Sequence, residues 1–156
     1  MTKLEDRIVA YTPAYSEAWR RLNTDWLVAG GFALEAKDHL TLDDPEGQIL
    51  SQGGQIFFAE REGAPVGCCG LIAMADGGYE VTKMTVRPDA RGRGLALRLL
   101  EACEAAAREA GAHRLYLETS STLGPALALY ARFGFMHLPP QPTPYARADV
   151  WMEKRL

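Results

Sequence analysis

Glycine and arginine alternate from Arg91 to Gly94, directly before a segment whose apolar residues recur at helical spacing. The first amides of a helix lack partners within the helix and carry partial positive charge, so a helix start is a natural phosphate site. Gly92 and Gly94 remove the side chains that would keep an anion away from that backbone. Arg91 and Arg93 add positive charge. The run therefore predicts a turn, between a strand and a helix, that binds a pyrophosphate group.

Other glycine-rich sites fit this run less well. The dinucleotide-binding fingerprint needs a third glycine, and a P-loop needs a following Gly-Lys-Ser/Thr, and neither is present. An RGG-type RNA-binding segment would repeat, whereas this run occurs once in a chain with a net charge of −3. A flexible helix start with solubilising arginines stays open as the structural alternative.

The elements around this turn follow from the pattern of the whole chain. Its 156 residues, 47% of them hydrophobic and 24% charged, are expected to form one domain over residues 1–156. Strand-like and helix-like segments alternate, which predicts a mixed α/β fold. The N-terminal part contains a predicted strand at 6–11 and a predicted helix at 13–30, and residues 32–50 could hold a second, shorter helix.

The middle of the chain is predicted to form an antiparallel meander. Three apolar or alternating runs, at 54–60, 66–74 and 79–86, are separated by turns that contain glycine. Even spacing predicts that Glu80 and Met84 share a face of the third strand. The two predicted faces are Tyr79, Val81, Lys83 and Thr85 on one side, and Glu80, Thr82, Met84 and Val86 on the other.

The C-terminal part is predicted to alternate helices and strands. A stripe of apolar and small residues predicts a helix over 95–110 that a glycine ends. A strand at 113–119 and a helix at 122–135 follow. Prolines make 139–144 a stiff loop, and alternating polarity predicts a closing strand over 145–156.

The other reactive residue types indicate packing. The chain has three cysteines, an odd number in an apolar context, which predicts buried free thiols. The three histidines lack metal-ligand spacing, so we expect no metal. Ser120 and Ser121 lack the Gly-x-Ser-x-Gly setting of a nucleophile elbow.

Charge and hydropathy exclude further classes of function. The net charge of −3 argues against partners such as nucleic acid or an anionic membrane, so an anion site must be local. No run of about 18 apolar residues or signal-peptide pattern is present, and we expect a cytoplasmic location.

Three ordered segments resemble the GNAT acetyltransferase superfamily. Arg91, Gly94 and Ala96 fill the family's acetyl-CoA-binding signature. A preceding strand ends in KMTV, a following strand reads LYLET, and ALALYARFGF is similar to a second signature in which a helical tyrosine precedes Gly-Phe. The resemblance implies a mixed, mostly antiparallel sheet of about seven strands flanked by about four helices.

Two further segments, LDDPEGQIL and YARADVWMEKRL, resemble a bacterial subgroup. That subgroup includes stand-alone enzymes and acetyltransferase modules fused behind a MarR-type DNA-binding domain. From the 156 residues of this chain, we expect no such fused domain.

The resemblance implies how coenzyme A is held. Amides of the glycine turn would bind its pyrophosphate, and the strand before the turn would pair with the pantetheine arm. Many family members carry an asparagine where this chain has Leu123, and Ser120, Ser121 or Thr122 could replace that contact. The implied cofactor-binding residues are Met84, Thr85, Val86, Arg91, Gly92, Arg93, Gly94, Leu95, Ala96 and Ser120.

The resemblance also implies two catalytic residues. Glu80 lies where many members place a glutamate base, and a base is needed because an amine acceptor is protonated at neutral pH. Tyr130 matches the tyrosine that protonates the departing thiolate. A solvated or ion-paired Glu80 and a merely packed Tyr130 are the alternatives.

For the acceptor, the family uses its first helices and the loop before the last strand. Asn23, Trp26, Tyr145 and Arg147 are the candidates, and Arg147 could meet an acceptor carboxylate. Packing is the alternative for each of them.

The implied function is direct transfer of an acetyl group from acetyl-CoA to a primary amine of a small molecule or peptide, in a ternary complex. A non-catalytic acyl-CoA-binding regulatory module is the alternative from another class. A homodimer is compatible with the sequence.

Overall fold

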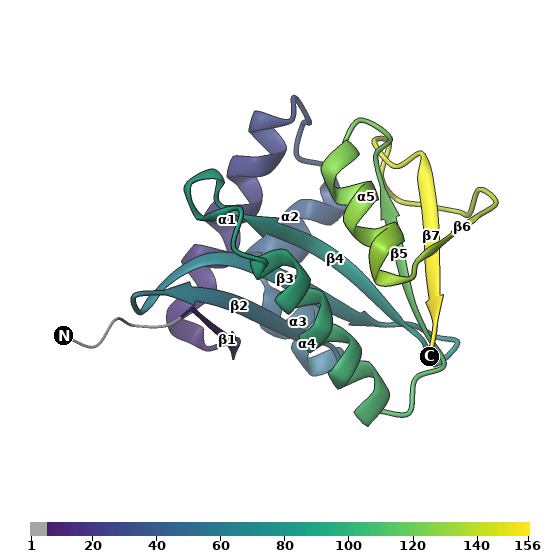
Figure 1. Cartoon of the computed structure of the whole chain (residues 1–156), viewed down its shortest axis with the longest axis horizontal. Coiled ribbons are helices and arrows are strands. Elements are labelled where there is room, and N and C mark those ends of the chain that lie inside the picture. Colours follow the sequence, from purple (N-terminus) through teal and green to yellow (C-terminus); the bar gives the residue numbers. More distant parts are fainter. Residues whose placement is uncertain (1–5) are drawn as a thin grey trace.

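The computed structural model describes residues 6–156 and contains, in that range, a seven-stranded sheet and five α-helices (Figure 1). The strands are β1 Arg7–Ala10, β2 Gln55–Arg61, β3 Ala64–Ala73, β4 Tyr79–Val86, β5 Arg114–Thr119, β6 Met136–Leu138 and β7 Val150–Arg155. The helices are α1 Ser16–Ala29, α2 Ala36–Asp43, α3 Pro45–Gln48, α4 Leu95–Glu109 and α5 Gly124–Phe133. The mixed α/β fold predicted from the sequence is confirmed.

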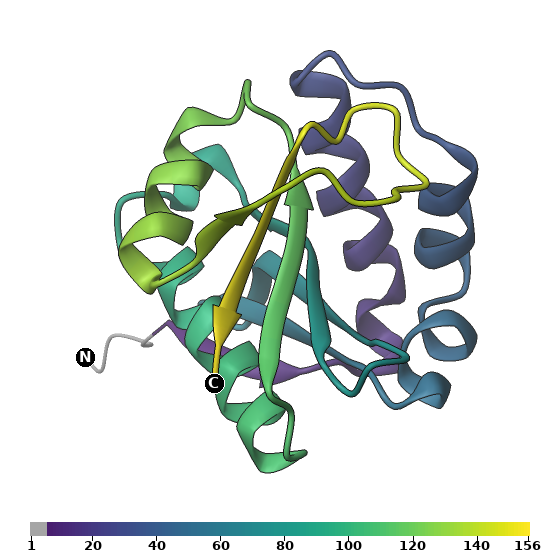
Figure 2. The ribbon, with the colours of Figure 1, turned by 90° about the vertical axis from the view of Figure 1, so that its right-hand side faces the viewer.

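The sheet has the order β1-β2-β3-β4-β5-β7-β6. The strand pairs described are antiparallel except for the central pair β4–β5. Helices α4 and α5 cover one face, while α1, α2 and α3 cover the other (Figure 2). The meander predicted in the middle of the chain is β2-β3-β4.

Two apolar clusters form the core, one on each face of the sheet. Leu99 and Cys103 of α4 belong to one cluster with Leu117 of β5, and Tyr130 and Phe133 of α5 join them. On the other face, Trp19 of α1 packs against Phe58. All three cysteines lie in the described residues and are buried and free, as predicted.

The sequence signals for helix ends agree with the structure. Gly134 ends α5 with a φ of 110°, and Gly111 follows α4 with a φ of 78°. Glycine adopts this left-handed backbone without steric strain, whereas a residue with a side chain does so only at an energetic cost. The predicted ends of both helices are therefore fixed by backbone conformation.

A β-bulge interrupts β4 and makes the predicted assignment of its faces wrong. Lys83 has a φ of 55°, and the register with β3 shifts between Cys68 and Gly70. The extra residue reverses the alternation, so Met84 and Val86 pack with the α4 cluster that also contains Val81.

At the bulge, Lys83 points to α2 on the other face of the sheet. Glu80 precedes the bulge and Met84 follows it, so the predicted shared face of these two residues is lost.

Strands β4 and β5 pair only at their beginnings. The parallel ladder contains Tyr79 with Leu115 and Glu80 with Tyr116. The rest of β4 stays paired with β3 on its other side, as far as Val86 with Gly67. The β5-facing edge of β4 is thus left without a strand partner after Glu80.

Two further differences concern segments without clear periodicity. Residues 32–52 contain α2, α3 and a short 3-10 helix instead of one helix. The closing strand begins at Val150, because residues 145–149 form a turn whose Asp149 amide donates to the Thr119 carbonyl. The short strand β6 was not predicted.

Two features are absent from residues 6–156. No helix combines the length and the apolar character needed to cross a membrane. No group of three or more His, Cys, Asp or Glu side chains is placed to hold a metal ion.

Candidate active site

A cavity of about 980 Å³ opens where β4 and β5 separate. Helices α4 and α5, the end of α1 and the turn before β7 complete its walls. Residues far apart in the sequence therefore face one space. Of the residues predicted for a site, those lining it are Trp26, Glu80, Met84, Thr85, Val86, Arg91, Gly92, Gly94, Leu95, Ala96, Ser120, Tyr130, Tyr145 and Arg147.

The glycine turn forms one end of the cavity. Gly92 and Gly94 have φ angles of 85° and 73°, and Gly94 is the N-cap of α4. No atom lies within 4 Å of a Cβ built on either glycine, so the backbone there is open to a ligand. The Arg91 Nε donates to the Val86 carbonyl at 3.1 Å and ties the turn to β4.

Arg93 is exposed and does not line the cavity. Its direct contact with the cofactor stays a prediction that this placement does not support. Arg132 of α5, which the sequence analysis did not select, lines the cavity instead.

Glu80 lies at the point where the two strands begin to separate. Burial and the neighbouring carboxylate of Glu118 raise the pKa of Glu80 to about 7, although Lys83 and Lys37 act in the opposite direction. A carboxyl group that titrates near neutral pH can both accept and release a proton there. The position and the pKa of Glu80 suit a general base.

Tyr130 is a buried side chain of α5 with 8% of its surface exposed. Its ring contacts Phe135 edge to face at a centroid distance of 5.8 Å. Burial raises the pKa of its hydroxyl well above the usual range, so this group stays protonated. Tyr130 lines the cavity, and a protonated hydroxyl can donate a proton or a hydrogen bond.

Ser120 and Leu123 border the cavity between β5 and α5. The Ser120 hydroxyl lies 2.8 Å from the Thr122 hydroxyl and accepts from the Thr122 amide at 3.3 Å. These contacts hold the Ser120 hydroxyl close to the loop that precedes α5.

A buried ion pair joins β4 to α2 beside the cavity. Lys83 Nζ donates to Asp38 Oδ1 at 2.6 Å, and the two residues are 6% and 0% exposed. Burial alone would raise the pKa of Asp38, but hydrogen bonds from Arg147 and Lys83 outweigh it and hold that pKa well below its usual value. Burial, together with the nearby charge of Arg147, lowers the pKa of Lys83, although Asp38 and Glu80 act in the opposite direction.

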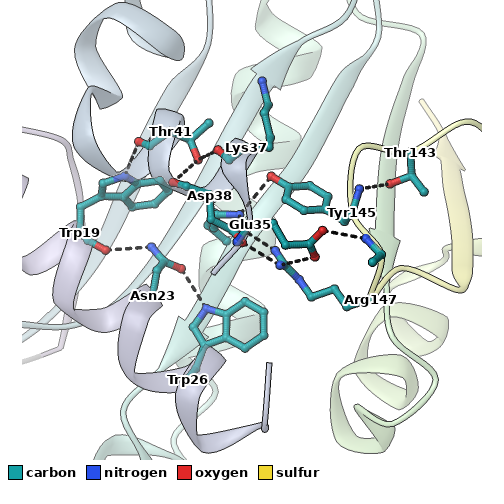
Figure 3. Close-up of polar contacts among 12 residues, drawn as sticks. Trp19, Asn23, Trp26, Glu35, Lys37, Asp38, Thr41, Thr143, Tyr145 and Arg147 are labelled. Atoms are coloured by element: carbon teal, nitrogen blue, oxygen red, sulfur yellow. Dashed lines mark hydrogen bonds and ion pairs between the residues drawn. The ribbon is translucent and has the colours of Figure 1, made fainter. Parts of the chain in front are cut away.

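Arg147 completes this cluster from the turn before β7 (Figure 3). Its two terminal nitrogens each donate to Asp38 at 2.7 Å, and one also donates to Glu35 at 3.2 Å. The other oxygen of Glu35 accepts from the Ala146 amide at 2.9 Å. The turn is therefore fastened to the start of α2.

Tyr145 lies between the two cations of the cluster. Its hydroxyl is 3.2 Å from Lys83 Nζ, and the Arg147 guanidinium stacks 4.3 Å from its ring centroid. These contacts make Tyr145 a fixed wall of the cavity.

Asn23 lies behind the cavity wall. It is 0% exposed, and its amide donates to the Trp19 carbonyl and accepts from the Trp26 indole at 3.0 Å (Figure 3). Asn23 therefore orients Trp26, which faces the cavity, and has no free group to offer an acceptor.

A second carboxylate, Glu118, lines the same cavity near Glu80. The Tyr116 hydroxyl donates to one of its oxygens at 3.0 Å and the Thr143 hydroxyl to the other at 2.8 Å. These hydroxyl donors hold the carboxylate of Glu118 in place, but they bring no positive charge to it.

Comparisons with known proteins agree with this architecture. Residues 5–135 match the model of the acetyltransferase (GNAT) family. This chain belongs to the acetyltransferase (GNAT) family. It is 36% identical over 119 residues to the uncharacterized N-acetyltransferase YjgM of Escherichia coli (strain K12), covering 71% of each protein.

Solved structures of other acetyltransferases share the fold. A GNAT acetyltransferase of Staphylococcus aureus Mu50 superposes with a TM-score of 0.89 at 21% identity, over 97% of this chain and 99% of that one. The yncA protein of Salmonella typhimurium, solved with its cofactor acetyl-CoA, gives a TM-score of 0.77 at 18% identity over 97% and 94%. The family resemblance inferred from the sequence is confirmed, and the subgroup with MarR fusions stays a prediction.

Sequence reasoning missed part of this acetyltransferase's site. Asp38, Lys83 and Glu35 form the buried cluster, and Glu118 supplies the second carboxylate. The sequence offered one signal for the cluster, which is the presence of Lys83 within a run of residues that favour a β-strand. The simple alternation of side chains assigned Lys83 to the wrong face of that strand. The partner of that lysine comes from a helix whose boundaries the sequence left unclear.

Proposed function

We propose that this enzyme transfers the acetyl group of acetyl-CoA directly to a primary amine of a small molecule or peptide. The observation that carries the proposal is that the glycine turn, Glu80 and Tyr130 line one cavity. A candidate cofactor site, a candidate base and a candidate acid therefore share the wall of one cavity, which supports the proposal.

The residues present fit coenzyme A. The open backbone of Gly92 and Gly94 and the positive charge of Arg91 suit its pyrophosphate. The free edge of β4 from Met84 to Val86 suits the pantetheine arm as an added strand. Bound acetyl-CoA would supply an acetyl thioester as the electrophile.

Glu80 would prepare the acceptor. An alkylamine with an ordinary pKa near 10.4 is protonated at neutral pH, and Glu80 takes one proton from its nitrogen. The freed nitrogen lone pair forms the new C–N bond as the C–S bond breaks. A second nitrogen proton leaves with amide formation.

Tyr130 would complete the transfer. The C–S electron pair goes to the sulfur, which receives a proton from the Tyr130 hydroxyl. The tyrosine then regains a proton from solvent, so the net products are an N-acetyl amine, free coenzyme A and one proton. A β4 amide would polarise the thioester carbonyl.

A two-step experiment tests this function. Acetyl-CoA should raise the melting temperature, because a ligand at 100 times its Kd adds about 2.7 kcal/mol to stability. Release of free thiol should then be measured over a panel of amines. Binding without turnover on a broad panel would favour a regulatory module, and the absence of any thermal shift would contradict the cofactor assignment.

A further inference from the structure

The walls of the cavity carry opposite charges at its two ends. Arg91 and Arg132 lie on the side of α4 and α5, where the coenzyme is proposed to bind. Glu80 and Glu118 lie on the side that faces α2. The inference below rests on the proposed function and concerns the chemical class of the acceptor.

The cations at the acceptor end are already neutralised by the protein. Lys83 is paired with Asp38 at 2.6 Å, and its side chain is 2% exposed. Arg147 is paired with Asp38 at 2.7 Å and Glu35 at 3.2 Å, and its side chain is 12% exposed. Neither cation is free to pair with a carboxylate of the acceptor, contrary to the role predicted for Arg147.

Breaking this cluster to receive a carboxylate would be costly. Asp38 is completely buried, so the loss of either cationic partner would leave part of its charge uncompensated in a site of low polarity. An acceptor carboxylate at this end would meet Glu80 and Glu118 as well. The site therefore disfavours amines that carry a neighbouring carboxylate.

Glu118 is arranged to receive a cation. Hydroxyl groups of Tyr116 and Thr143 donate one hydrogen bond to each of its oxygens. A carboxylate has about four acceptor positions, so half of them remain available. Within residues 6–156, Glu118 forms no ion pair, in contrast to the paired carboxylates of the buried cluster.

The two free carboxylates lie close together on neighbouring strands. Glu80 is paired with Tyr116 in the parallel ladder, and Glu118 lies two residues further along β5. Standard strand spacing and rise place their Cα atoms about 8 Å apart. Lys37 influences Glu80 from α2 but does not line the cavity.

We propose that the acceptor is an alkylamine with a second positively charged nitrogen, and that Glu118 binds this second cation while the reacting nitrogen lies at Glu80. The second charge orients the acceptor along the line from β5 to β4. A carboxylate next to either nitrogen weakens binding.

Three amines of matched length test the proposal. The compounds are 1,5-diaminopentane, pentylamine, which lacks the second nitrogen, and lysine, which adds a carboxylate to the diamine. We expect kcat/KM for the diamine to exceed that for each of the others by about tenfold or more, as one charge-assisted hydrogen bond provides. Equal or better use of pentylamine or lysine would overturn the proposal.

Binding is measured separately from turnover. Each amine is titrated by calorimetry into the protein saturated with free coenzyme A, which cannot react. The diamine should bind about tenfold more tightly than pentylamine or lysine. If no amine is acetylated while the diamine still shows this preference, the proposed function fails and the acceptor class stands.

A pair of charge-neutralising variants locates the effect. Glu118→Gln should reduce the ratio of diamine to pentylamine kcat/KM to near one. Glu101→Gln is the matched control, because this exposed glutamate of α4 does not line the cavity and its change alters the net charge equally. An unchanged ratio in Glu118→Gln would overturn the role of Glu118, and melting temperatures of both variants check folding.

Discussion

Lys83 Nζ lies 2.6 Å from Asp38 Oδ1, which joins the bulge of β4 to the first turn of α2 across 45 residues of sequence. Lys83 also donates to the Tyr145 hydroxyl, and Asp38 also binds Arg147. One buried ion pair thus links the central strand, a helix and the turn before β7. The acceptor side of the cavity depends on this link.

Removal of the negative charge in this cluster should be strongly destabilising. Asp38→Asn leaves the buried Lys83 without a counterion and Arg147 with Glu35 alone, and we expect a loss of about 3–5 kcal/mol in the free energy of unfolding. Lys83→Met should cost less, because Asp38 keeps both hydrogen bonds from Arg147. Urea denaturation of the two variants measures the difference. A Lys83→Met variant as unstable as Asp38→Asn would contradict this account.

The glycine turn can be tested with a control on the same helix. Gly94→Ala forces alanine into a left-handed backbone at the start of α4, and Gly111→Ala does the same just after its end. Neither added Cβ would meet an atom within 4 Å. Both should therefore lose about 1–2 kcal/mol of stability.

Only Gly94→Ala should also weaken acetyl-CoA binding, by about tenfold or more, because the added Cβ would occupy space in the proposed phosphate site. Calorimetric titration of acetyl-CoA into both variants provides the measurement. Comparable losses of affinity in the two variants would remove the turn as the phosphate site.

The activity should follow the ionisation of Glu80. The base must be deprotonated, so its contribution to kcat/KM should rise with pH through about 7, the pKa to which burial and Glu118 raise it. Glu80→Gln should lose about 10²–10⁴-fold in rate above that pH. The ratio of wild-type to variant kcat/KM, plotted against pH, cancels the titration of the acceptor itself. A flat ratio would exclude Glu80 as the base.

The same substitution should stabilise the fold at alkaline pH. A raised pKa means that the folded protein binds the proton more tightly than the unfolded chain, so the charged form is disfavoured by folding. The loss of folding stability caused by the charged Glu80 is absent below about pH 4.5, where the carboxyl group is protonated in both states, and is fully present above about pH 7. Glu80→Gln should gain about 1–3 kcal/mol relative to wild type at pH 8 and nothing at pH 4. Thermal denaturation at both pH values is the measurement.

Tyr130→Phe should separate catalysis from binding. The hydroxyl makes no hydrogen bond within residues 6–156 that the change would break, and the ring contact with Phe135 is preserved. We expect turnover to fall far more than the affinity for acetyl-CoA. Equal turnover in the two proteins would leave Tyr130 as a packing residue.

Local chemistry allowed much of this structure to be predicted. Helix ends at Gly111 and Gly134 follow from backbone freedom, and the meander follows from alternation and turns. The open turn at Gly92 and Gly94 was predicted because its conformation is set within the backbone of a short segment, and its phosphate-binding role stays a proposal. These features depend on neighbours in the sequence, so the sequence alone determined them.

The tertiary structure decided how the charges on the α2 side of the cavity are paired. A bulge in β4 turned Lys83 toward α2, and the cost of burying its charge is met by Asp38, which comes from a distant helix. Arg147, a candidate to meet an acceptor carboxylate, is paired with Asp38 instead, while Glu118 lines the cavity without an ion pair among residues 6–156. Pairing among distant charges depends on which elements pack together, and no local pattern in the sequence contains that information.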